Sequence, residues 1–161
     1  MNEELQVTQE TLDYIRGMIY HSPNKLIAMA GVQVAELEER HIKLEMPLGD
    51  VHVNHVGTAY AISMIMLMEM AGASLLQCTY GVKKFVPILK RIDIRYQKPT
   101  DKTLVCDLSL TMEEAEKLIA PVLERGRGNT PLKIKLTDIT GADIAEADFG
   151  FYLIPMDMKL V

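Results

Sequence analysis

Tryptophan is absent from the sequence, and cysteine occurs only twice, at Cys78 and Cys106. The two cysteines stand at no spacing typical of a metal or redox site, and a chain of 161 residues can bury a core without disulfide bonds. The opening segment, MNEELQVTQETL, lacks the basic and apolar regions of a signal peptide, and no internal repeat is visible. We therefore expect one domain over residues 1–161, reduced and cytoplasmic.

Charge is almost missing from one long stretch, Val56–Val82. It reads VGTAYAISMIMLMEMAGASLLQCTYGV, and its 27 residues include one charged side chain, Glu69. A helix over Ser63–Leu76 would be apolar on every face, so it requires cover from the protein or from a membrane. A carboxylate at its midpoint argues against a membrane span. We expect a buried helix in which Glu69 has a partner or a shifted pKa.

The rest of the sequence predicts short elements around this helix. Residues 8–21 and 112–125 have helical periodicity, and the second helix begins at the capping box Thr111–Glu114 and contains Pro121, which should kink or split it. Alternating patterns predict strands within 32–37, 42–46, 88–97, 103–110, 132–137 and 142–154. In the third of these strands, Ile88, Ile92, Ile94 and Tyr96 are expected to share one face.

An antiparallel sheet with one apolar face needs a cover, and the apolar helix is the natural one. Thr58 is the expected N-cap of that helix, and Gly81 the expected end. A single sheet covers only one side of the helix, so a second copy of the molecule should cover the other. The pattern therefore predicts a homodimer or a dimer of dimers.

Basic residues are concentrated in one segment of an acidic protein. The full chain has a net charge of −5, whereas residues 83–102 have a net charge of +5. The basic residues are Lys83, Lys84, Lys90, Arg91, Arg95, Lys98 and Lys102. A local basic face suits a small anionic ligand better than nucleic acid, which favours a basic domain. His52 and His55 have no acid or cysteine at useful spacing, so no metal site is predicted.

The start of the apolar stretch resembles a known motif. Asn54–Ile62, NHVGTAYAI, is similar to the N-x-x-G-x-x-H-G-G loop of phenylacetate-degradation-type hotdog thioesterases, with Tyr60, Ala61 and Ile62 in place of the histidine and two glycines. Glu69 follows Tyr60 by nine residues, which is the position of an acid in that group. Ile94–Pro99, IRYQKP, resembles the strand and turn that follow the helix there.

The resemblance implies an α+β hotdog fold, in which an antiparallel sheet wraps around a central apolar helix. It covers residues 31–154, preceded by an N-terminal helical segment over residues 1–30 and interrupted by an inserted helix near 112–126. It also implies an acyl-CoA thioesterase that needs no cofactor, with acyl-CoA as the substrate. The alternatives are a non-catalytic acyl-ligand-binding hotdog protein and a hotdog dehydratase, although the usual His–Asp pairing of the dehydratases is not evident.

The resemblance also assigns roles to residues. Glu69 is the general base or nucleophile, with a paired structural carboxylate as the alternative. Asn54 orients water or the carboxylate, with a purely structural Asx turn as the alternative. The substrate contacts are expected from Gly57, Thr58, Tyr60, Ala61 and Ile62, where the β-branched Ile62 should crowd the carbonyl. Nine residues of α-helix rise about 13.5 Å, so the helix start and Glu69 of one chain cannot both contact one carbonyl. A shared site therefore requires two subunits with antiparallel helices.

Overall fold

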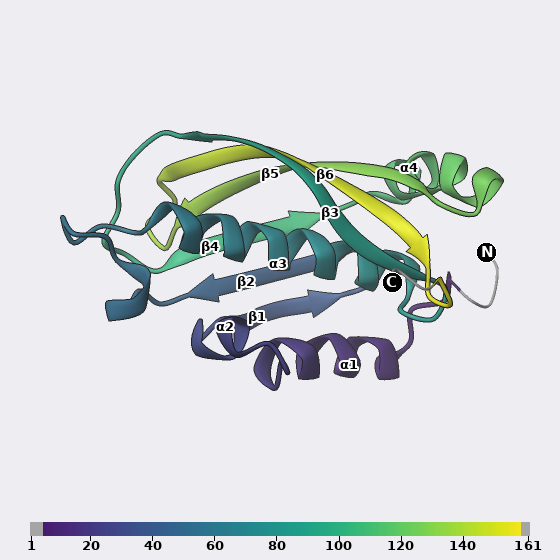
Figure 1. The fold of residues 1–161 in the computed structure, drawn as a ribbon, viewed down its shortest axis with the longest axis horizontal. Coiled ribbons are helices and arrows are strands. Elements are labelled where there is room, and N and C mark those ends of the chain that lie inside the picture. Colours follow the sequence, from purple (N-terminus) through teal and green to yellow (C-terminus); the bar gives the residue numbers. More distant parts are fainter. Residues whose placement is uncertain (1–4, 159–161) are drawn as a thin grey trace.

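The computed structural model describes residues 5–158. Its elements follow the expected order along the chain (Figure 1). They are α1 (Gln9–Tyr20), α2 (Lys25–Met29), β1 (Gln33–Glu38), β2 (His41–Met46), a 3₁₀ turn (Asp50–His52), α3 (Ala61–Tyr80), β3 (Phe85–Tyr96), β4 (Leu104–Ser109), α4 (Met112–Arg125), β5 (Gly128–Asp138) and β6 (Asp143–Pro155).

The strands form one six-stranded antiparallel sheet in the order β1-β2-β4-β5-β6-β3. The sheet curves around α3, which lies along its concave face (Figure 1). Strand β6 shows the strict alternation that the sequence predicts, with Ala145, Ala147, Phe149, Phe151 and Leu153 all buried. This arrangement is the hotdog fold, so the predicted fold class is confirmed.

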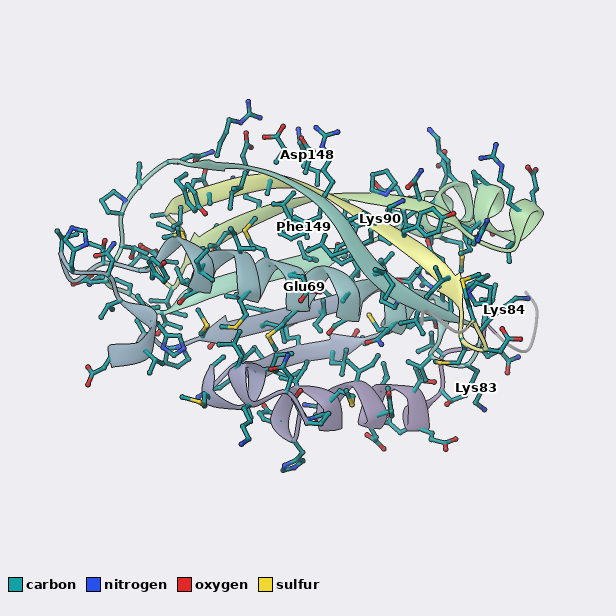
Figure 2. The ribbon with its side chains drawn as sticks, in the orientation of Figure 1. Glu69, Lys83, Lys84, Lys90, Asp148 and Phe149 are labelled. Carbon is teal, nitrogen blue, oxygen red and sulfur yellow. The ribbon has the colours of Figure 1, made fainter. Side chains whose placement is uncertain are left out.

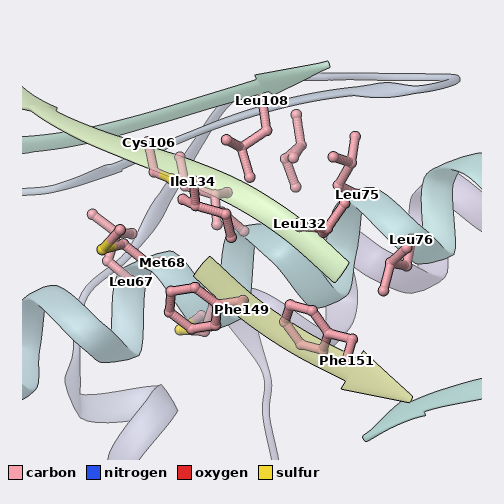
Figure 3. Close-up of a cluster of buried hydrophobic side chains, with 14 of the residues drawn as sticks. Leu67, Met68, Leu75, Leu76, Cys106, Leu108, Leu132, Ile134, Phe149 and Phe151 are labelled. Carbon is pink, nitrogen blue, oxygen red and sulfur yellow. The ribbon is translucent and has the colours of Figure 1, made fainter. Parts of the chain in front are cut away.

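Contact between α3 and the sheet is close because one helical position lacks a side chain. A Cβ atom at Gly72 would lie 2.7 Å from the Phe151 ring and 2.9 Å from the Ile134 side chain. Figure 3 shows both side chains in the buried cluster that surrounds the helix, together with Leu67, Met68 and Leu75. Gly72 therefore allows the backbone of α3 to approach β5 and β6 directly.

One stripe of α3 stays partly uncovered. It consists of Ile62, Ile65, Met66, Glu69, Ala73 and Gln77. The helix is long and apolar enough to cross a membrane by composition, yet most of it is buried within the protein. Helix α1 supplies some of the cover that we expected from a second subunit, because Ile15 and Ile19 are buried beside α3. The half-exposed stripe still leaves apolar surface for a partner.

The structure corrects three local expectations. Helix α3 begins at Ala61 with Tyr60 as its N-cap, because the Thr58 carbonyl instead accepts a hydrogen bond from the Asn54 N–H at 2.8 Å. Of the two effects expected of Pro121, a kink or a split, the split does not occur, because α4 is continuous. In β3, the register shifts between Leu89 and Arg91. This bulge pairs Leu89 with the buried Phe151, so Ile88 lies on the opposite face from the rest of its predicted set.

Candidate functional site

The N-terminus of α3 has no side-chain cap. Tyr60 is the N-cap residue, with φ −75° and ψ 137°, and its side chain caps no amide. Within residues 5–158, the amide N–H groups of Ala61, Ile62 and Ser63 have no hydrogen-bond acceptor. Unpaired amides at a helix start, together with the positive end of the helix dipole, form a ready site for an anion or a developing oxyanion.

Asn54 builds the loop that leads into the helix. Its amide oxygen accepts hydrogen bonds from the N–H groups of Val56 (3.0 Å) and Thr58 (3.2 Å), and its amide nitrogen donates to the Thr58 hydroxyl (2.9 Å). Gly57 adopts a positive φ of 79° within this turn. The side chain of Asn54 therefore holds the loop closed, and its predicted role in orienting water stays a prediction.

A second loop, after β3, buttresses the helix start. The Thr100 carbonyl accepts a hydrogen bond from the Ala59 N–H at 2.8 Å. The buried Thr100 hydroxyl donates to the Asp138 carboxylate at 2.9 Å. Hydrogen bonds from Thr140 and Thr100 lower the pKa of Asp138, which keeps this carboxylate charged. The turn after β5 is thereby linked to the start of α3 through Thr100.

These two loops border an open pocket of about 500 Å³. Its lining includes four of the predicted site residues, namely Asn54, Thr58, Tyr60 and Ala61, and also Tyr96 and Lys98. The Tyr96 hydroxyl donates to the Ala61 carbonyl at 3.4 Å. Lys98 is exposed and makes no ion pair with any residue in 5–158, so its charge is available at the pocket rim.

Glu69 lies near the middle of α3, half-buried on the uncovered stripe (Figure 2). It borders a smaller pocket of about 180 Å³ between α3 and α1, with Ile15, Met18 and Ile27 among its neighbours. No residue in the described range forms a hydrogen bond or ion pair with its carboxylate. Burial raises the pKa of Glu69 above its ordinary value of 4.5. An unpaired, desolvated carboxylate is suited to accept a proton.

The basic residues of segment 83–102 do not form one face. Lys83 and Lys84 follow the C-terminal end of α3, at the end opposite Ala61, and Lys90 lies on β3 (Figure 2). Lys90 stands over the Tyr152 ring, 4.4 Å from its centroid, while Arg95 pairs with Glu146 at 3.1 Å. Lys98 is the basic residue of the segment that lines the pocket at the helix start.

Two polar residues near the helix start were not predicted as site residues. His52 and Ser63 are each 5% exposed, and both line a third pocket with Ile62 on the α2 side of α3. Ile62 itself is 54% exposed and does not line the pocket that contains Asn54. Its predicted crowding of the carbonyl therefore stays a prediction.

Several solved structures that resemble this chain are described as thioesterases. A protein of unknown function from Pseudomonas aeruginosa, described as a probable thioesterase, is 26% identical with a TM-score of 0.79, covering 89% of this chain and 95% of that one. A thioesterase from Haemophilus influenzae is 12% identical with a TM-score of 0.72, covering 98% and 99%. A hypothetical thioesterase from Streptococcus pneumoniae, with coenzyme A, is 12% identical with a TM-score of 0.59, covering 78% and 90%.

The fold and these neighbours define the chain as a thioesterase-like hotdog protein. Within that class, it belongs to the family described as a domain of unknown function (DUF4442), which it matches over residues 26–153. Among curated proteins, none matches the chain. The family match begins within α2 and ends within β6, so it includes every residue of the predicted site.

Proposed function

We propose that the protein is a cytoplasmic thioester hydrolase that acts on acyl-CoA as a homodimer or a dimer of dimers. The observation that carries the proposal is the uncapped start of α3, where the amides of Ala61 and Ile62 have no acceptor, on the same helix as the unpaired Glu69. A thioester hydrolase needs both features: donors for an oxyanion and a base for water.

The proposed reaction uses water and no cofactor. Glu69 accepts a proton from a water molecule, and the resulting hydroxide bonds to the thioester carbon. The oxyanion that forms is held by the amide N–H of Ala61 or Ile62. The C–S bond then breaks, the carboxylic acid is released, and the CoA sulfur leaves as a thiolate or takes the proton from Glu69.

The spacing along α3 supports a site shared between subunits. Eight residues separate Ala61 from Glu69, which corresponds to about 12 Å of helix. Strand β3 is a 12-residue edge strand, so its outer edge is available for pairing. If two β3 strands pair about a two-fold axis perpendicular to the sheet, both α3 helices lie antiparallel on one face. Glu69 of one subunit then approaches the helix start of the other.

The charge at the pocket of the helix start supports a CoA thioester. Lys98 at its rim is exposed and makes no ion pair within residues 5–158, so it is available to pair with a CoA phosphate. A solved structure of a hypothetical thioesterase with the same fold is described with coenzyme A, which supports this class of ligand. The small-molecule partner is therefore proposed to be an acyl-CoA.

A non-catalytic acyl-ligand-binding protein is the second candidate. The observation that favours it is Asn54, whose amide is already occupied by Val56 and Thr58. The test is a hydrolysis screen over short, long and aromatic acyl-CoAs with the parent protein and Glu69→Gln. Turnover by the parent that Glu69→Gln loses supports the hydrolase, whereas binding of acyl-CoA without turnover supports the second candidate.

A further inference from the structure

The ring of His52 is enclosed and incompletely hydrogen-bonded. Its Nδ1 atom accepts a hydrogen bond from the Gly49 N–H at 3.1 Å, so the neutral ring carries its proton on Nε2. The Nε2 atom is buried, and no residue in the described range 5–158 offers it an acceptor. A buried donor without a partner is costly and rare in folded proteins. A ligand oxygen or a water molecule in contact with Nε2 would supply the acceptor that residues 5–158 do not.

A pocket of about 160 Å³ lies where that acceptor would enter. It is lined by His52, Tyr60, Ser63 and a mostly apolar wall. The apolar members are Leu26, Met29, Ala30, Val51, Ile62 and Met66. Ser63 is also mostly buried, at 5% exposed, and places its side chain beside His52 in the lining. An unpaired buried donor in a mostly apolar pocket is typical of a ligand site.

The pocket also borders the first turn of α3. Ile62 and Ser63 contribute both side chains to its lining and unpaired amides to the helix start. Its volume corresponds to about five water-sized groups, so it fits the first carbons of an acyl chain rather than a whole CoA ester. The wall is apolar and the donors are few, which matches a carbonyl oxygen with apolar carbons beside it.

We propose that this pocket holds the carbonyl end of the acyl group, with the Nε2–H of His52 donating a hydrogen bond to the ligand oxygen. The inference rests on the proposed acyl-CoA ligand and adds His52 as a substrate-binding residue. Because Nε2 carries the proton, His52 acts as a donor and not as the base. The apolar wall from α2 and Val51 contacts the adjoining carbons.

Two substitutions test the hydrogen bonds of the two His52 ring nitrogen atoms separately. In His52→Asn, the amide oxygen stands near the position of Nδ1 and keeps the bond from Gly49, while the donor at Nε2 is lost. In His52→Gln, the longer side chain places an amide N–H near the position of Nε2, while the bond to Gly49 is lost. The pair is matched because each variant keeps one polar contact and removes the other.

The experiment measures binding of two non-hydrolysable CoA conjugates by titration calorimetry. One is an S-alkyl-CoA without a carbonyl, and the other is an S-(2-oxoalkyl)-CoA with the same chain length and a ketone. The parent should bind the ketone about 3- to 10-fold more tightly, as expected for one hydrogen bond. His52→Asn should lose this preference, and His52→Gln should keep it.

The remaining outcomes contradict either the His52 contact or the proposed acyl-CoA ligand. If His52→Asn keeps the preference, the donor role is wrong. If His52→Gln loses the preference and stability while His52→Asn keeps both, His52 serves only to anchor Gly49, and the inference is again wrong. If the parent binds neither conjugate, the proposed acyl-CoA ligand fails first and removes the basis of the inference. Binding of the S-alkyl-CoA without any ketone preference contradicts the His52 contact alone.

Discussion

Glu69 lies eight residues after Ala61 on α3, so about 12 Å of helix separates the unpaired carboxylate from the first unpaired amide of the same chain. Both groups lack partners within the described residues, yet they are too far apart to act on one carbonyl. If Glu69 is the base and the helix start the oxyanion site, as we propose, the two can act on one carbonyl only when they come from two molecules. Catalysis and assembly are therefore expected to depend on each other.

Removing the base should abolish turnover without unfolding the protein. Glu69→Gln keeps the shape of the side chain but cannot accept a proton, so hydrolysis of the best acyl-CoA should fall by about 10²–10⁴-fold. The control is Glu124→Gln on the exposed face of α4, which should hydrolyse at the parental rate. Steady-state kinetics measures the hydrolysis rates of Glu69→Gln and Glu124→Gln. Equal rates for the two variants would show that Glu69 takes no part in the mechanism.

The raised pKa of Glu69 predicts how activity and stability change with pH. Between 4.5 and the raised value, the folded protein keeps a proton that the unfolded chain has released. The free energy of unfolding should therefore fall as pH rises through this range, while kcat/KM should rise as the base ionises. Denaturant unfolding of the parent and Glu69→Gln at several pH values checks this. A parent–variant difference in stability that does not vary with pH would contradict it.

Proline at Ala61 tests the helix-start amide with little structural cost. Proline is tolerated at the first position of a helix, and Tyr60 already has the extended conformation that precedes proline. Ala61→Pro removes one N–H, and loss of one oxyanion donor typically lowers kcat by about 10²–10³-fold. Thermal unfolding should show a folded protein. A folded variant with parental kcat would assign the donor to Ile62 or reject the oxyanion site.

The buried link between Thr100 and Asp138 should hold the helix start in place. Thr100→Val removes the hydroxyl that donates to Asp138 and accepts from the Lys102 N–H. The loss should cost about 1–3 kcal/mol of stability. Thr103→Val is the control, because its hydroxyl makes no hydrogen bond within residues 5–158. Equal urea midpoints for Thr100→Val and Thr103→Val would show that the hydrogen bond between Thr100 and Asp138 does not contribute to the free energy of unfolding.

Periodicity predicted most of the helices and strands, and the resemblance added the hotdog arrangement. The nearly uncharged stretch around Glu69 identified α3, and the alternation of β6 identified a strand with one buried face. Periodicity did not reveal the bulge near Lys90, because a one-residue insertion in a strand leaves no compositional mark. It also did not show that α1 covers part of α3, since that contact depends on the path of the chain between them.

Four residues of the predicted site lie together, although their roles stay predictions. Asn54, Thr58, Tyr60 and Ala61, which the resemblance to the loop motif singled out, line one pocket. The sequence suggested only a metal-ligand role for His52 to consider. The residues around it do not show whether its ring N–H has a hydrogen-bond acceptor. Ser63 was hidden among the apolar residues of the helix. Only the folded chain, in which both line one pocket, singles out these two residues.

The central claim is that one active site uses Glu69 from one subunit and the helix start from another, and subunit mixing tests it most directly. Glu69→Gln and Ala61→Pro proteins, each nearly inactive alone, are mixed, allowed to exchange subunits and assayed for acyl-CoA hydrolysis. Half of the dimers should then be mixed, and each mixed dimer should contain one intact site of two. The account predicts recovery of about one quarter of the parental rate. No recovery, with subunit exchange verified by native mass spectrometry, would contradict a site shared between subunits.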